Sequence, residues 1–171
     1  PDAPELHLWS SALAREQQEY GQAFDQLAKV GDRLDERWEY HRERALLAQS
    51  AGLYSEARKS AGKWADLSVD ARSARLFESI LLYQVEGLHE RAARQLKDLS
   101  EGNLDNFAET WELFLHASHA SRLAGDLGGA LALVTGLEVV LQDQATCLPI
   151  LHMEEAVEYR ITILGWNNQR Q

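Results

Sequence analysis

Apolar side chains recur every three or four residues along most of the chain, which is the spacing of a helix with a buried face. Between residues 70 and 86 these side chains fall on two faces instead of one. The first face comprises Ala74, Phe77, Leu81, Leu82 and Val85, and the second comprises Leu76, Ile80 and Tyr83. A helix that is apolar on two faces must contact neighbours on both sides, as an internal helix of a stacked repeat does.

The pattern predicts nine helices and no strand, so we expect an all-α fold. No segment alternates apolar and polar residues with a β-branched bias. The three prolines are Pro1, Pro4 and Pro149, so residues 5–148 contain none that would interrupt a helix. The predicted helices span residues 5–17, 20–31, 35–51, 54–67, 70–86, 89–100, 104–124, 127–143 and 149–164.

Three short segments between these helices share one pattern, which is a Gly, a large residue two positions later and an Ala three positions beyond that. They are residues 52–57, 87–92 and 125–130. A weaker copy at residues 18–23 has Gln in place of the Gly. The four terminal alanines are separated by 34, 35 and 38 residues. A nearly fixed period of this size indicates an array of helix-turn-helix repeats.

The expected helix boundaries have local causes. The Gly of each full segment follows a run of good helix formers, where a residue must enter the left-handed region at little cost. Asp35, Asp70 and Asn103 stand where helices are expected to begin, and their side chains can accept hydrogen bonds from free N–H groups of the first turn.

At these residues the chain resembles a tetratricopeptide-repeat (TPR) array, whose repeat of about 34 residues is a pair of antiparallel helices. The family's turn signature is a Gly, an aromatic residue two positions on, and an Ala. Gly52, Tyr54 and Ala57 match it fully, whereas His89 and Leu127 occupy the aromatic position of the next two copies. The resemblance implies a right-handed α-solenoid in one domain of residues 1–171. Its four repeats would span residues 5–34, 35–69, 70–103 and 104–144, followed by a capping helix at 149–164.

The sequence departs from the family pattern at some positions. The family has a small residue midway along the first helix of each repeat. Counting back from each terminal Ala places Ser11, Ala45, Ile80 and Ser118 there, and Ile80 is too bulky for the usual close packing. The family's Pro at the repeat end is absent. The third interval implies an insertion near residues 102–103. Trp38, Trp64 and Trp111 are expected to pack between helices.

Charge excludes some classes of partner. The net charge of −10 and the pI near 5.0 argue against nucleic acid and against an anionic membrane surface. No apolar run approaches the roughly 20 residues needed to span a bilayer. The one cysteine cannot form an intrachain disulfide, so the compartment stays open. We expect the chain to be a piece of a larger protein, because repeat arrays are often parts of longer chains.

In the resembled family, the first helix of each repeat lines a concave groove that binds a partner. Carried over by position, this predicts an apolar strip with an acidic rim of Glu39, Glu43, Glu78 and Glu112. Such a surface suits a peptide or helix with apolar anchors and some basic residues. The candidate groove residues are Trp9, Arg42, Leu46, Phe77, Leu81, Gln84, Leu115, His116, His119 and Arg122.

The resemblance therefore implies a protein-interaction scaffold or adaptor, with no enzymatic activity and no cofactor. Leu46 stands where family members that grip chaperone tails carry an Asn, so a different ligand is expected. One alternative is a structural or self-associating segment of a larger protein, in which the terminal repeats stack on neighbours or on another copy.

A second alternative is a metal protein. Glu112, His116 and His119 are spaced by four and three residues, which places them on one helix face. A zinc site needs three or four ligands and supporting contacts, and no other feature of the sequence indicates this face. We therefore expect no metal there.

Overall fold

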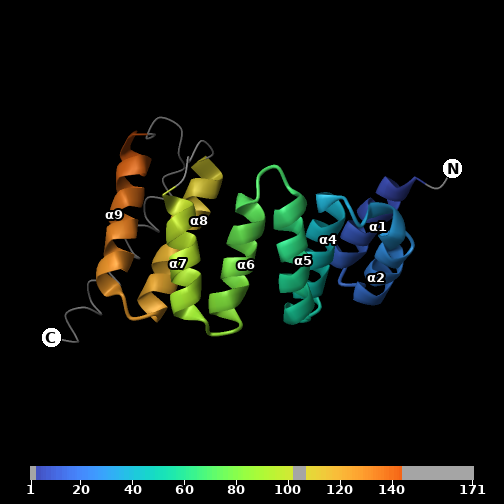
Figure 1. Ribbon diagram of the computed structural model, residues 1–171, viewed down its shortest axis with the longest axis horizontal. Helices are drawn as coiled ribbons and strands as arrows, with labels where there is room; N and C mark the ends of the chain where they lie inside the picture. The colour runs from blue at the N-terminus through green and yellow to red at the C-terminus, as the bar shows by residue number, and fades with distance from the viewer. Residues whose placement is uncertain (1–2, 102–106, 144–171) are drawn as a thin grey trace. The chain divides into compact units, whose positions relative to one another are not determined.

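The computed structural model describes the backbone of residues 3–101 and 107–143, and the side chains of residues 3–101 and 111–137. Within these ranges the chain is all-α, as predicted, with nine helices and no strand (Figure 1). None of the described helices is both long and apolar enough to cross a bilayer. The helices are α1 (Pro4–Glu16), α2 (Tyr20–Ala28), α3 (Gly31–Leu34), α4 (Trp38–Ser50), α5 (Tyr54–Leu67), α6 (Arg72–Gln84), α7 (His89–Ser100), α8 (Phe107–Leu123) and α9 (Leu127–Asp143).

Seven of the nine predicted helices match a described helix closely, and the other two need comment. The predicted helix over residues 20–31 ends at Ala28, because the backbone of Val30 leaves the helical region with φ −124° and ψ −1°. The short helix α3, which was not predicted, begins after it. The predicted capping helix at 149–164 lies outside the described residues.

The three predicted capping residues behave differently. Asp70 Oδ1 accepts a hydrogen bond from the backbone N–H of Arg72 at 2.9 Å, as expected for the start of α6. Asp35 does not begin a helix, because α4 starts only at Trp38. Instead, the carbonyl of Asp35 contacts His41 Nε2 at 2.8 Å and its carboxylate pairs with Lys63 at 3.2 Å. Asn103 lies outside the described residues.

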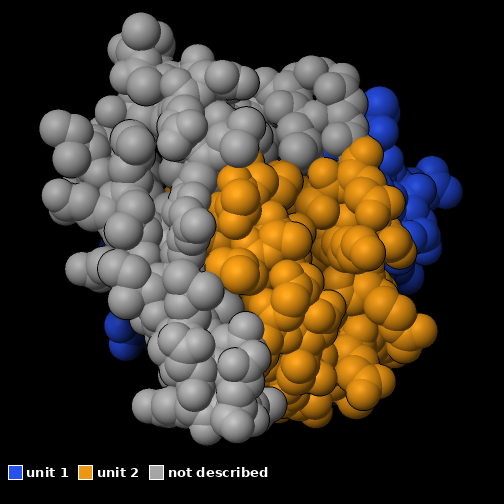
Figure 2. Space-filling model, turned by 90° about the vertical axis from the view of Figure 1, so that its left-hand side faces the viewer, with its two compact units in different colours: residues 1–81 blue, residues 82–171 orange. Residues whose placement is uncertain are grey.

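The chain forms two compact units, residues 1–81 and 82–171, which Figure 2 distinguishes by colour. In the first unit, α1 packs against α2 and α4, and α4 packs against α5. In the second unit, α8 packs against both α7 and α9. The boundary falls within α6. The assignment of all 171 residues to one domain stays a prediction.

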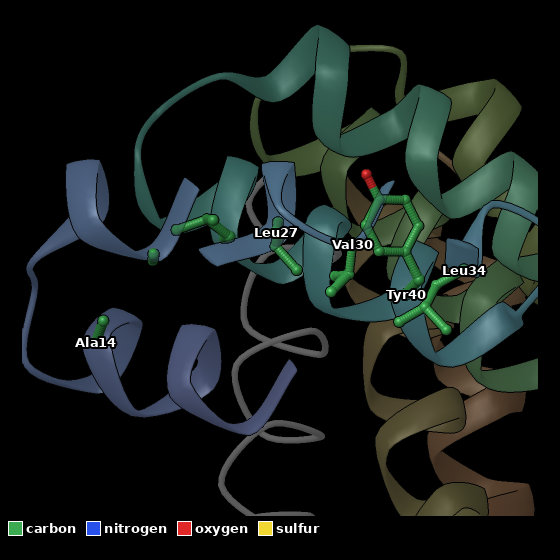
Figure 3. Packing of buried hydrophobic residues seen from close by; sticks show 7 residues of the cluster. Ala14, Leu27, Val30, Leu34 and Tyr40 are labelled. Carbon is green, nitrogen blue, oxygen red and sulfur yellow. The ribbon is translucent and has the colours of Figure 1, made fainter. Parts of the chain in front are cut away.

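The core of the first unit shows how one helix pair covers the next. Leu27, Val30 and Leu34 from the α2–α3 segment pack with Tyr40 and Leu47 of α4. Figure 3 shows Val30 and Leu34 beside the Tyr40 ring. Burial of these side chains from water is the main source of stability for such a stack, because each helix pair alone has an exposed apolar face.

All four copies of the turn segment place their first residue in the left-handed region. Gly52, Gly87 and Gly125 have φ of 75°, 68° and 87°, and Gln18 has φ of 62°. The Ala that ends each copy is fully buried. The weak copy at residues 18–23 is therefore a turn of the same backbone class, although Gln occupies the place that favours Gly.

The turn before α7 is one residue longer than the other three. In the other turns, the N–H of Glu19, Leu53 or Asp126 bonds to the carbonyl five residues earlier, as in a Schellman motif. In this turn the N–H of Leu88 bonds to the carbonyl of Leu82, six residues earlier.

This extra residue changes the repeat alignment of α6 by one position. Aligned on the turn hydrogen bonds, the small midpoint position of α6 is Ser79 and not Ile80. Ser79 is fully buried, like Ser11, Ala45 and Ser118 at the same position of the other first helices. The count from the sequence placed Ile80 at this small position only because the turn before α7 is one residue longer than the others.

Candidate functional site

The described surface of the first unit has a pocket of about 500 Å³ at the ends of three helices. It is lined by Trp38 and Arg42 of α4 and by Trp64 of α5. The α5–α6 loop and the start of α6 complete the pocket with Ser68, Val69, Asp70 and Ser73. We call this the Trp38–Trp64 pocket. Trp38 is 37% exposed and Trp64 only 6%, so the Trp38 indole supplies most of the aromatic surface to which a side chain of a partner could bind.

Contacts within the first unit partly position the charged groups of this pocket. The guanidinium carbon of Arg42 lies 6.0 Å from the centroid of the Trp64 ring, which is cation–π distance. Phe77 of α6 contacts the same indole, with ring centroids 6.2 Å apart. Asp70 already accepts the N–H of Arg72, so part of its carboxylate is engaged in capping α6. Arg42 therefore supplies a positive charge beside an aromatic surface.

The predicted groove residues of the first unit do not all face solvent. Arg42 is exposed, and Leu46 and Phe77 are half-buried. Leu81 is 1% exposed and packs with Ala48 and Ala57 in a core cluster, so its assignment to a binding surface is wrong. Trp9 is 76% exposed on α1, where it does not line the Trp38–Trp64 pocket.

Three of the four glutamates of the predicted acidic rim have an arginine partner in the first unit. Glu39 pairs with Arg37 at 3.2 Å, and Glu78 lies 3.7 Å from Arg75. Glu43 is buried and accepts from Arg15 Nε at 3.2 Å. Burial raises the pKa of the Glu43 carboxyl, and the hydrogen bond from Arg15 opposes this effect. These ion pairs weaken the expectation that the surface attracts basic residues.

In the second unit, the predicted groove residues of α8 lie near the end of α6. The Tyr83 hydroxyl and His116 Nδ1 are 2.5 Å apart, and Gln84 Nε2 donates to the same hydroxyl at 3.1 Å. Leu115, His116, His119 and Arg122 are half-buried, and Gln84 is exposed.

Both histidines of this group have a lowered pKa. Burial lowers the pKa of His116. Burial, with the positive charge of Arg122 and the neighbouring His116, lowers the pKa of His119 to about 4. Both rings are therefore neutral at pH 7, and they act there as neutral hydrogen-bonding groups. Among the described residues, no group of three His, Cys, Asp or Glu side chains could hold a metal ion, so Glu112, His116 and His119 do not form such a site.

The alignment counted from the sequence misassigned two groove positions because it was one position out in α6, and of the two residues that take these positions Ile80 is half-buried and Tyr83 is buried. In the corrected alignment, Ile80 and Tyr83 replace Leu81 and Gln84 as the counterparts of Leu46 and Gln49. The unusual size of Ile80 at a small position, beside Ser79, was the available signal. Nothing in the sequence indicated the pocket residues Val69 and Ser73, because Val69 belongs to the α5–α6 loop and Ser73 to the first turn of α6.

The packing roles predicted for three tryptophans are mostly confirmed. Trp64 and Trp111 are buried. Trp38 remains 37% exposed and forms part of the pocket wall instead.

Comparison with known proteins supports the fold. No protein-family model matches the sequence, and no curated protein matches it. A solved structure from Podospora anserina, whose description names a kinesin light chain with nearly identical TPR-like repeats, is similar to this chain. The TM-score is 0.78 at 13% identity, and the match covers 100% of this chain and 91% of the other. The chain thus has the fold of a TPR-like helical-repeat protein, as the sequence predicted.

Proposed function

We propose that the protein is a non-catalytic interaction scaffold that binds a peptide segment of a partner protein through its first unit. The observation that carries this proposal is the Trp38–Trp64 pocket, which combines aromatic walls with an exposed cation. TPR-like repeats usually serve as protein-binding surfaces, and the fold supports this broad class of function.

The pocket chemistry favours a particular kind of peptide. A large apolar side chain of the partner would enter the pocket and contact the exposed part of the Trp38 indole. A carboxylate next to that side chain would meet the Arg42 guanidinium, which lies 6.0 Å from the centroid of the Trp64 ring. In this proposal the partner peptide carries a carboxylate and not the basic residues expected from the sequence. The reason is that Arg37, Arg15 and Arg75 already pair with the glutamates of the rim.

The half-buried side chains beside the pocket extend the surface. Leu46 of α4 and Phe77 and Ile80 of α6 are half-buried, so part of each side chain is open to solvent. They can contact further apolar residues of a bound segment. In this proposal the pocket supplies specificity and the neighbouring apolar positions supply additional contact area.

A random peptide display selection against the intact chain tests the proposal. Selected peptides should share a large apolar residue next to Asp, Glu or a C-terminal carboxylate. Trp38→Ala should weaken their binding at least about tenfold, since loss of one well-packed aromatic anchor commonly costs more than about 1.4 kcal/mol. Arg42→Gln should weaken only the peptides that carry the carboxylate.

Trp9→Ala is the matched control, because Trp9 is exposed and lies outside the pocket. It should leave the affinity of the selected peptides unchanged. A selection without a shared motif, or peptides that bind Trp38→Ala as well as the parent, would contradict the proposed site. Circular dichroism of each variant separates loss of binding from loss of fold.

A further inference from the structure

The second unit has a pocket of about 380 Å³ where the start of α7 meets the end of α8. Leu88, whose N–H closes the longer turn before α7, lines this pocket together with Leu123 of α8. Both leucines are 43% exposed, so they offer an apolar surface that is open to solvent. We call this the Leu88–Leu123 pocket. Its described lining residues fall within residues 87–124, so it shares none with the Trp38–Trp64 pocket.

Two arginines of α7 line the same pocket. Arg91 and Arg94 are exposed and stand three residues apart, which places them on one face of the helix. Nε of Arg94 lies 3.5 Å from the carbonyl of Glu90, at the limit of a hydrogen bond. In the described part of the chain, no carboxylate pairs with either guanidinium. The rim arginines of the first unit, in contrast, each pair with a glutamate.

The two guanidinium groups are not engaged in capping α8. In the turn after α8, the carbonyls of Ser121 and Arg122 accept hydrogen bonds from the backbone N–H groups of Asp126 and Gly125. Among the described residues, neither guanidinium of the pocket donates to a carbonyl of α8. Both positive charges are therefore available to an anionic group that enters the pocket.

We propose that the Leu88–Leu123 pocket binds an acidic segment of a partner protein, in which two Asp or Glu residues flank a large apolar residue. The apolar side chain contacts the two leucines, and the carboxylates accept hydrogen bonds from Arg91 and Arg94. Charge complementarity selects an acidic partner, because two unpaired arginines outweigh Glu90, the one carboxylate among the described lining residues. This site goes beyond the proposed peptide binding by the first unit and does not depend on it.

Peptide display with a variant chain tests this site separately from the first unit. The bait carries Trp38→Ala and Arg42→Gln, which remove two lining residues of the Trp38–Trp64 pocket and leave the second unit unchanged. Selected peptides should carry two acidic residues beside a large apolar one. Their dissociation constant should rise when salt increases from about 50 to 500 mM. A selection that yields no such peptide would overturn the proposal, whether or not the first unit binds its own peptide.

Charge variants of α7, measured by calorimetric titration of the selected peptides, test the role of the arginines. Arg91→Gln and Arg94→Gln should each raise the dissociation constant at least about threefold, because each removes a charge-assisted hydrogen bond. Glu90→Gln should lower it, since the carboxylate that repels the peptide is lost. Lys97→Gln is the matched control, because Lys97 is an exposed cation of α7 outside the pocket. Equal weakening by Lys97→Gln and Arg91→Gln would overturn the proposed site, because attraction to the net charge of the helix would then explain the binding.

A leucine variant tests the apolar part of the pocket. Leu123→Gln should raise the dissociation constant at least about threefold, because the partner's apolar side chain loses its contact. Leu53→Gln is the matched control, since Leu53 is 48% exposed in the turn before α5 and lies outside the pocket. Circular dichroism of each variant verifies that the fold is kept. Peptides that bind the folded Leu123→Gln protein as tightly as the bait would also overturn the proposal.

Discussion

The N–H of Leu88 donates to the carbonyl of Leu82 across six residues, whereas the corresponding bond spans five residues in the other three turns. The longer turn places Ser79 at the close-packed midpoint of α6. Ser79→Leu should therefore lower the free energy of unfolding by about 1–3 kcal/mol, because the added methylenes have no space. Ile80→Ala should cost less, since Ile80 is only half-buried. Urea denaturation of both variants checks the alignment. A larger loss of unfolding free energy for Ile80→Ala than for Ser79→Leu would support the alignment counted from the sequence instead.

Backbone strain at Gln18 can be relieved. Gln18 has φ of 62°, in a region that L residues other than Gly enter at a cost of about 1 kcal/mol. Gln18→Gly should therefore raise the midpoint of thermal unfolding, and Gly52→Ala should lower it. Gly62→Ala serves as the control, because Gly62 lies within α5 and a Cβ added there would meet no atom within 4 Å. It should stabilise the helix by up to about 1 kcal/mol. Equal effects of Gly52→Ala and Gly62→Ala would exclude the conformational explanation.

The buried alanines of the turn segments should not tolerate larger side chains. Ala57 and Ala92 are fully buried at the start of α5 and α7. Ala57→Leu or Ala92→Leu should each lower the free energy of unfolding by about 1–3 kcal/mol through overpacking. Lys59→Leu, at an exposed position of the same helix as Ala57, makes a similar change without overpacking. Ala variants that melt like the Lys59→Leu protein would argue against close packing at these turns.

Stability should fall as the pH drops below neutral. The folded pKa of His119 is about 4 and that of an unfolded His is about 6.5, so in between the unfolded chain binds a proton that the folded chain does not. Unfolding is therefore favoured progressively as pH falls from 6.5 towards 4, and the lowered pKa of His116 acts in the same direction. His119→Gln should flatten the dependence of the melting temperature on pH in this window.

Glu43 provides a contrast of opposite sign. Burial raises its folded pKa, so its contribution to stability decreases as pH rises through that pKa. Glu43→Gln removes this opposing contribution, and the fall in stability between pH 6.5 and 4 should become steeper. Melting curves that respond identically in the parent, His119→Gln and Glu43→Gln proteins would refute the assignment of these pH effects.

The fold class and the repeat follow from the amino-acid sequence alone. Periodic apolar residues, the absence of internal proline and the glycines of three turn segments all act locally, so they can be interpreted without knowledge of the tertiary structure. Even the weak copy at residues 18–23 was identified, because it keeps the large residue and the Ala at the repeat period. The backbone of Gln18 takes the same left-handed conformation as the glycines of the other copies.

The tertiary structure decided which of the repeat positions are exposed. Leu81 and Leu46 are both apolar residues of first helices, yet Leu81 is buried and Leu46 is half-exposed. One additional residue in the turn before α7 rotates the alignment of α6 by about 100°, and a count from the next Ala cannot detect it. The Trp38–Trp64 pocket likewise depends on side chains from three helices and a loop, which the packing of these helices brings together. Exposure and pocket shape are properties of packed neighbours, and a one-residue change in a turn alters them without changing the hydrophobic pattern.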